Sequence, residues 1–167
     1  MRSRYKIFND EALYFVTSTT IEWVSIFTNE KYYNILIEAI KFYQTKSKLE
    51  IFAYVILPNH FHLILRSKEL INIMKLIKMY SAKEIIKQLT EDRKNQILEL
   101  LRLSKKNYKT QSNYQVWQEG YKPKEILSDK MLRQKIDYIH YNPVKKGLVS
   151  EPIDWKYSSA GFYETSV

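Results

Sequence analysis

The feature that most constrains the fold is a pair of strongly apolar runs joined by two turn-forming residues. Residues 51–57 (IFAYVIL) have the length of a buried strand, and residues 60–65 (HFHLIL) form a second such run. Pro58 and Asn59 separate them. Both favour tight turns, because proline fixes φ and asparagine tolerates unusual backbone angles. The segment therefore predicts a β-hairpin.

Two histidines occupy alternate positions at the start of the second run. In a strand, residues i and i+2 point to the same face, so His60 and His62 lie side by side while Phe61 turns into the core. Two imidazoles on one face of a rigid strand are a ready pair of ligands for a divalent metal. The alternative is two surface histidines on a half-exposed strand, which is the usual interpretation of an isolated H-x-H triplet. The preceding apolar strand and tight turn favour the metal pair here.

The remaining pattern predicts an α+β sandwich. A strand is expected over 12–20 and an amphipathic helix over 30–48. A helical pattern begins at Leu70 and extends or restarts as far as Leu89. With a further helix late in the chain, this order favours an antiparallel sheet with helices packed on it.

A phenol and an amide are predicted to share one face of that late helix. The helix is expected over 129–141, with a cap at Ser128 or the next residue, and Pro143 ends it because the residue before a proline avoids the α region. Tyr138 points away from the apolar seam, and Asn142 follows it by four residues, about one turn away. The pair could serve as a nucleophile and a further metal ligand. Because the chain contains 14 tyrosines, Tyr138 alone says little.

Charge and residue content narrow the possible functions. The formal net charge is +9 and the pI is near 9.5, which favours a polyanionic partner such as nucleic acid, or an acidic membrane surface. No run approaches the ~18 apolar residues of a membrane span and no secretory signal is evident, so a cytoplasmic protein is expected. The absence of cysteine excludes thiolate–metal chemistry, and three glycines exclude a glycine-rich phosphate loop. One domain is predicted over 1–167, with a basic arm over 1–10 and a segment over 91–112 that can be flexible.

Several segments together resemble the REP-associated tyrosine transposases, within the single-tyrosine transposases of the His-hydrophobic-His nuclease superfamily. The resemblance is carried by YFVT at 14–17, VILPNHFHL at 55–63, VWQ at 116–118, DYIHYNPVKKGLV at 137–149 and WKYSSA at 155–160. It covers nearly the whole chain, and the two histidine-containing segments are the most specific.

The resemblance implies a ferredoxin-like α+β sandwich with the histidines on a central strand. It implies that His60 and His62 bind a divalent metal, Mg²⁺ or Mn²⁺, and that Asn142 offers a third ligand. Tyr138 matches the nucleophile, which in this family attacks a DNA phosphate, leaving a 5′-phosphotyrosine and a free 3′-hydroxyl. A later attack by a 3′-hydroxyl reseals the strand. The nitrogen-rich ligand set could equally hold Zn²⁺ or Ni²⁺ in a purified sample.

Relatives in the family recognise short DNA hairpins, so single-stranded or hairpin DNA is the expected partner of a monomer or homodimer at the nucleoid. The predicted phosphate contacts are Arg2, Arg4, Lys6, Lys75, Lys78 and Lys83. A solvated helix face is the alternative for the last three. Trp117 and Tyr121 could stack bases, although Trp117 is more typical of a core anchor. His140 is interpreted as a packed, hydrogen-bonded histidine.

Two other functions compete with a DNA transesterase. One is a catalytically silent DNA-hairpin-binding protein, which the presence of both histidines, Tyr138 and Asn142 disfavours. The other is a metal-dependent phosphodiesterase that uses activated water. No acidic residue closely follows the histidine pair, so a carboxylate-rich hydrolase site is hard to assemble.

Overall fold

Four strands form one antiparallel sheet in the order β2-β3-β1-β4. The computed structural model describes residues 9–164, so the predicted contacts of Arg2, Arg4 and Lys6 lie outside the described residues. The strands are β1 (Tyr14–Thr19), β2 (Glu50–Leu57), β3 (His60–Arg66) and β4 (Lys124–Glu125). The predicted hairpin is β2-β3, and Leu57 pairs with His60 across its two-residue turn.

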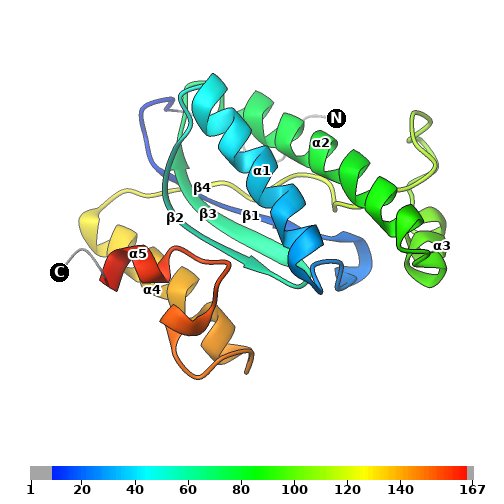
Figure 1. The fold of residues 1–167 in the computed structure, drawn as a ribbon. Helices are drawn as coiled ribbons and strands as arrows, with labels where there is room; N and C mark the ends of the chain where they lie inside the picture. The colour runs from blue at the N-terminus through cyan, green and yellow to red at the C-terminus, as the bar shows by residue number, and fades with distance from the viewer. Residues whose placement is uncertain (1–8, 165–167) are drawn as a thin grey trace.

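Helices cover both faces of this sheet. They are α1 (Glu30–Lys46), α2 (Leu70–Glu91), α3 (Asn95–Leu103), α4 (Asp129–Lys145) and α5 (Ala160–Glu164), with short 3₁₀ turns η1 (Ile21–Trp23) and η2 (Pro152–Asp154). Figure 1 shows α1 and α2 on one side of the sheet and α4 with α5 on the other. The strand order and the β1-α1-β2-β3-α2 succession confirm the α+β, ferredoxin-like prediction. None of the helices within residues 9–164 is both long and apolar enough to cross a bilayer.

The two sheet faces carry separate apolar cores. On one face Val16, Phe61 and Leu63 pack with the buried sides of α1 and α2. On the other face Phe15 and Ile64 pack with residues of α4. Residues 61–65 of β3 are therefore all buried, and the histidine face is not the half-exposed surface of the alternative interpretation. Because α4 packs on this face of the sheet, the late helix lies next to the histidines.

The chain after α4 returns along the edge strand β2. The backbone N–H of Ile56 donates to the carbonyl of Tyr157 at 2.8 Å, and the indole N–H of Trp155 donates to the Ile56 carbonyl at 2.9 Å. Ser159 continues this pairing through its N–H to the Tyr54 carbonyl at 2.9 Å. These bonds satisfy part of the free strand edge and fix the elements that flank α4.

The predicted end of the late helix is wrong. Pro143 lies inside α4, which continues to Lys145. The proline removes the N–H that would have bonded to Ile139, but one missing bond in the last turn is tolerated, because the Lys146 N–H still reaches the Asn142 carbonyl at 3.1 Å. Asn142 is consequently held in helical geometry, on the same face as Tyr138.

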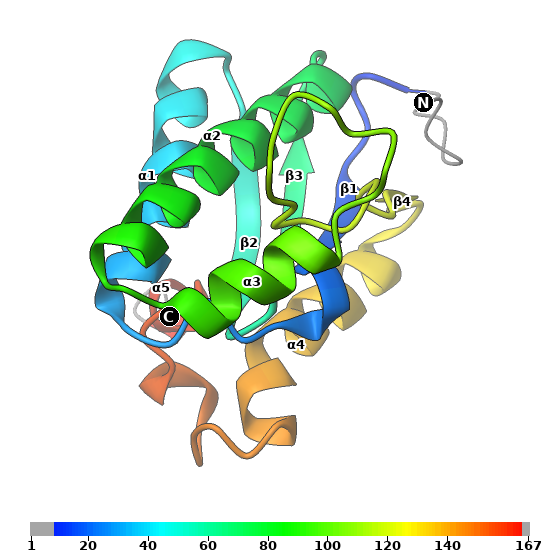
Figure 2. The same ribbon diagram turned by 90° about the vertical axis from the view of Figure 1, so that its right-hand side faces the viewer.

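The charged segment after α2 contains a further short helix. In α3 the side chains of Leu98 and Leu101 are buried, while the remaining residues are mostly exposed. Figure 2 shows α3 following α2 and the next segment returning towards β1. That segment joins the sheet end, where the Gln118 N–H donates to the Thr19 carbonyl at 2.8 Å.

Candidate active site and metal centre

A polar hollow of about 470 Å³ lies where β1, β3 and α4 meet. It is lined by Thr17, Thr19, Trp23, Asn59, His60, His62, Tyr138, Asn142, Lys145 and Lys146. The four residues predicted to carry the chemistry, His60, His62, Tyr138 and Asn142, thus converge within one chain. They come from a strand and a helix separated by more than sixty residues of sequence.

The strand register explains why the histidines face this hollow. His60 pairs with Thr19 and His62 pairs with Thr17 in the antiparallel β1-β3 ladder, so all four side chains lie on the α4 side of the sheet. The two imidazole centroids are 4.9 Å apart. This is the side-by-side arrangement predicted from the H-x-H spacing.

A hydrogen-bond chain orients His60. The side-chain N–H of Asn59 donates to the Trp23 carbonyl at 3.2 Å, which turns the Asn59 amide oxygen towards the ring of His60. That oxygen lies 2.6 Å from Nδ1 of His60. Because an amide oxygen only accepts, Nδ1 must carry the proton and Nε2 keeps its lone pair. A neutral imidazole in this tautomer can bind a metal through Nε2.

His62 is oriented in a similar way from the neighbouring strand. The hydroxyl of Thr17 lies 2.7 Å from its Nδ1. Phe15 stacks on the ring with centroids 5.2 Å apart and planes 22° from parallel. The ring is therefore held on two sides, and its Nε2 is directed away from the strand that holds it.

Both histidines are neutral in this environment. Burial, together with repulsion from Lys146, lowers the pKa of His60 to about 4. Burial lowers the pKa of His62 to about 3, and repulsion from Lys146 and Lys135, and from His60 when that ring is protonated, acts in the same direction. At neutral pH neither ring needs to lose a proton before it can bind a cation.

Two buried polar atoms of the hollow lack a hydrogen-bond partner among the described residues. They are Nε2 of His62 and the side-chain oxygen Oδ1 of Asn142. An unpaired buried polar atom costs about 1–3 kcal/mol, so such atoms need an explanation. A divalent cation would satisfy both, with Nε2 of His60 as a third donor. Across residues 9–164 no group of three or more His, Cys, Asp or Glu side chains could hold a metal, so a metal bound by the two histidines would need the Asn142 amide or a ligand from outside the chain as its third donor.

Tyr138 lies directly beside this donor set. Its ring centroid is 5.3 Å from that of His62 and 5.8 Å from that of Phe15, and both contacts are edge-on. The side chain is 39% exposed, in contrast to the buried His62 and Asn142. A phenol at the mouth of the hollow can reach a ligand from solvent while its ring is held by packing.

Three lysines surround the phenol. The ammonium of Lys135 lies 5.4 Å from the Tyr138 ring centre and that of Lys145 lies 5.9 Å from it. Lys146 lines the hollow itself. None of the three forms an ion pair with any residue from 9 to 164. Their positive charge is therefore free to attract an anion to the hollow.

Other predicted site residues have different surroundings. His140 is buried, with Nε2 2.9 Å from the Ser159 hydroxyl, so its interpretation as a packed histidine is confirmed. Trp117 is 5% exposed and donates its indole N–H to the Ser81 hydroxyl at 3.1 Å, and Tyr121 is also buried. Neither ring can stack a base without leaving the core. The core-anchor interpretation of Trp117 is the correct one.

The predicted lysine contacts on α2 lie across the sheet from the hollow. Lys75 and Lys83 are exposed there, and their binding to DNA stays a prediction. Lys78 does not fit that prediction, because its ammonium donates to the carbonyls of Gln118 (2.7 Å) and Gly120. Burial lowers its pKa to about 8. Its role is to hold the segment that follows α3.

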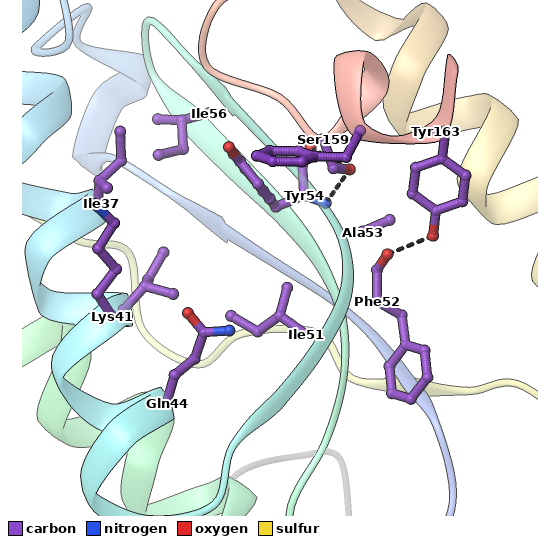
Figure 3. A pocket seen from close by; sticks show the side chains of 12 residues that line it. Ile37, Lys41, Gln44, Ile51, Phe52, Ala53, Tyr54, Ile56, Ser159 and Tyr163 are labelled. Carbon is purple, nitrogen blue, oxygen red and sulfur yellow. Dashed lines mark hydrogen bonds between the residues drawn. The ribbon is translucent and has the colours of Figure 1, made fainter. Parts of the chain in front are cut away.

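A second hollow, of about 330 Å³, lies along the edge strand β2 between α1 and the C-terminal segment (Figure 3). Tyr163 donates to the Phe52 carbonyl and the Tyr54 N–H donates to the Ser159 hydroxyl at its margin. Its lining is mainly apolar and includes none of the predicted site residues.

The sequence patterns missed the residues that orient the histidines. Asn59 was interpreted only as a turn residue, and Thr17 only as part of a strand. An antiparallel register would place Thr17 opposite His62, but the register depends on tertiary contacts. Lys145 and Lys146 belong to the PVKKGLV run, and their position beside Tyr138 follows from helix spacing once α4 is known to pass Pro143.

Comparison with known proteins supports the resemblance. No protein-family model matches the chain. A candidate REP-associated tyrosine transposase of Haemophilus influenzae is 33% identical over 110 residues, which make up 66% of this chain and 58% of that protein. The aligned part is thus less than two thirds of the relative's length. A solved structure of a REP-associated tyrosine transposase bound to a REP hairpin has a TM-score of 0.71 and 23% identity, over 96% of this chain and 84% of that one. The resemblance of this chain to the REP-associated tyrosine transposases is confirmed in sequence by the first comparison and in fold by the second.

Proposed function

We propose that the protein cleaves and rejoins single-stranded or hairpin DNA through a covalent bond between Tyr138 and a 5′-phosphate. The observation that carries this proposal is the convergence of four groups in one basic hollow. A half-exposed phenol lies beside two neutral imidazoles and an unpaired amide oxygen, with lysine ammonium groups around them. Phosphoryl transfer depends on such positioning and charge neutralisation more than on acid–base groups.

His60, His62 and Asn142 would hold a divalent cation. Bound there, Mg²⁺ or Mn²⁺ supplies a Lewis acid that polarises the scissile phosphate and stabilises charge on its oxygens. The residues contribute two neutral imidazole rings, that of His60 with its tautomer set by Asn59, and one amide oxygen that has no other partner within residues 9–164. This set also suits Zn²⁺ or Ni²⁺.

Tyr138 supplies the nucleophile. Its oxygen forms a bond to phosphorus while the bond to the 3′-oxygen breaks. The phenol proton passes to solvent, and the departing 3′-oxygen takes a proton from solvent. The product is a 5′-phosphotyrosine, which conserves the energy of the broken ester. A 3′-hydroxyl can then reverse the displacement, so rejoining requires no ATP.

The lysines would bind the phosphates on either side of the cleaved bond. Lys145 and Lys146 follow Tyr138 by seven and eight residues, so they project from the end of α4 towards the same hollow. Lys135 lies one turn before Tyr138 and contacts the Phe15 ring with its ammonium at 4.6 Å. In a partly buried site, such ammonium groups stabilise charge that develops on a phosphoryl oxygen.

The family supports DNA as the substrate. The similar structure contains a transposase with a REP hairpin bound. All four proposed site residues are contributed by one chain, so the proposal does not require a second protomer to complete the site. A protein that acts in this way would work at the nucleoid.

The test is the formation of a covalent protein–DNA adduct. A DNA hairpin with single-stranded flanks and a 3′ label is incubated with the protein and Mn²⁺, then separated under denaturing conditions. We expect a labelled adduct that disappears in Tyr138→Phe and with a chelator. Tyr141→Phe is the matched control, because Tyr141 is an exposed tyrosine on the same helix outside the hollow, and it should retain the adduct.

Two results would contradict the proposal. Hairpin binding with no adduct in the wild type would indicate a silent binding protein. Equal cleavage by the wild type and Tyr138→Phe would indicate hydrolysis by activated water.

A further inference from the structure

An exposed tryptophan lies on the rim of the histidine hollow. Trp23 lines the hollow and is 65% exposed. The other two tryptophans, Trp117 and Trp155, are buried or half-buried, and each donates its indole N–H within the protein. Trp23 is therefore the most exposed of the three tryptophans, and it lines the same hollow as the proposed nucleophile.

The backbone holds this ring out of the core. Glu22 and Trp23 have φ of 49° and 51°, a left-handed conformation that is unfavourable for residues with a Cβ atom. The segment is fixed on both sides of them. The buried Ile21 donates its N–H to the Val116 carbonyl at 2.8 Å, and the Thr20 hydroxyl donates to the Val24 carbonyl at 2.8 Å. Strained conformations that are held in this way cluster at ligand sites.

The position of Trp23 is coupled to the metal donors. Its carbonyl accepts from the Asn59 side chain, which orients Nδ1 of His60. The backbone that carries the indole is thus fixed relative to the donor set. A ligand group that stacks on this ring would be aligned with the phosphate held at the histidines.

The chemistry of the rim points to an unpaired nucleobase. Lys145 and Lys146 line the same hollow and attract phosphates, while the indole offers a flat π-face next to them. Alternating phosphates and flat bases are the pattern of single-stranded DNA, and aromatic rings beside basic groups are how proteins bind it. Bases in a duplex are already stacked on one another and cannot use this face.

We infer that Trp23 is a stacking platform for the base next to the scissile phosphate in single-stranded DNA. The inference rests on the proposed function, because it takes the histidine hollow as the place of the phosphate. Trp23 acts by positioning the strand and does not take part in the chemical step.

Binding without chemistry tests this inference. The probe is an unlabelled single strand of about 16 nucleotides of mixed sequence, added in the presence of a chelator while tryptophan emission is followed. We expect quenching of the exposed tryptophan in the wild type, and affinity about 5- to 100-fold weaker in Trp23→Ala. Trp23→Phe should be intermediate. Alanine retains the Cβ atom and the carbonyl of residue 23, so the backbone and the Asn59 contact are unchanged.

The control is Phe42→Ala, which removes an aromatic ring that is 53% exposed on α1, and it should bind like the wild type. Mn²⁺ affinity should be unchanged in Trp23→Ala. Equal affinity of Trp23→Ala and wild type, or equal quenching by a duplex of the same sequence, would overturn the inference. The adduct assay is a separate readout. If Trp23 stacks on a base but no Tyr138-dependent adduct forms, the stacking inference is supported and the proposed reaction is contradicted.

Discussion

At the scale of single residues, each histidine owes its orientation to a different neighbour. Asn59 fixes the tautomer of His60 through an acceptor oxygen, and Thr17 binds Nδ1 of His62. Partners of this kind set the ring orientation and the basicity of the metal-binding nitrogen. The metal affinity of the hollow should therefore depend on residues that do not touch the metal.

Thr17→Val tests this dependence. Valine has nearly the shape of threonine but lacks the hydroxyl that pairs with Nδ1 of His62. Metal affinity should fall about 10- to 100-fold, as measured by calorimetric titration with Mn²⁺. Thr19→Val is the matched control, because Thr19 lines the same hollow without a hydrogen bond to either ring. Equal losses in the two variants would show that Thr17 does not orient His62.

The metal-free protein should lose stability in mild acid. The folded chain holds His60 and His62 at pKa values of about 4 and 3, whereas the unfolded chain has the ordinary value of 6.5. Below pH 6.5 the unfolded chain binds more protons, so the free energy of unfolding falls as the pH falls towards the folded pKa. The loss should be about 2–4 kcal/mol between about pH 6.5 and 4.5.

Urea unfolding in a chelator at the two pH values measures this loss. The double variant His60→Gln, His62→Gln lacks both titrating groups and should lose less stability over the same interval. A loss of the same size in the variant would assign it to carboxylates elsewhere.

At the scale of elements, the positive charge next to the histidine hollow comes from lysines of α4 and its C-terminal end, and not from the lysines of α2. Lys135, Lys145 and Lys146 have no ion pair within residues 9–164 and lie around Tyr138. The lysines of α2 lie on the opposite face of the sheet, which also packs against α1. The two sets should therefore contribute differently to binding of a single strand.

Lys146→Ala should reduce the salt dependence of single-strand binding. For each phosphate contact that is lost, the slope of log affinity against log salt should become shallower by about 0.7. Lys83→Ala removes the same charge from an exposed position on α2 and should leave the slope unchanged. The measurement is fluorescence anisotropy of a short labelled strand over a range of salt. A larger effect of Lys83→Ala would place the strand on the other face of the sheet.

The elements themselves were largely predictable from the sequence. Period-two and helical spacing were enough to predict the hairpin, the side-by-side histidines and the shared face of Tyr138 and Asn142. The course of α4 past Pro143 was not predicted, because a proline near a helix end removes a single bond whose loss the surrounding packing can offset. The hydrogen bonds of Lys78 were also missed, since helical spacing does not show which loop carbonyls will lie next to an ammonium group.

At the scale of the whole molecule, the site exists because α4 packs on the face of β3 that carries the histidines. Local sequence patterns predicted the histidine pair on a strand and the tyrosine–asparagine pair on a helix. They did not predict that the two pairs lie together, because this depends on the strand order and on the core around Phe15 and Ile139. Only the family resemblance predicted that these two pairs form one site. The other residues that line this site, such as Thr17, Trp23 and Lys146, could be identified only from the tertiary structure.

The most direct measurement of the central claim is to locate the nucleotide on the protein. Wild-type protein is incubated with Mn²⁺ and a DNA hairpin that has single-stranded flanks. It is then digested with nuclease and protease and analysed by peptide mass spectrometry. The account predicts a nucleotide linked through its 5′-phosphate to Tyr138, and none when a chelator is present. A nucleotide on Tyr141 or another residue, or a cut strand with no modified peptide, would contradict it.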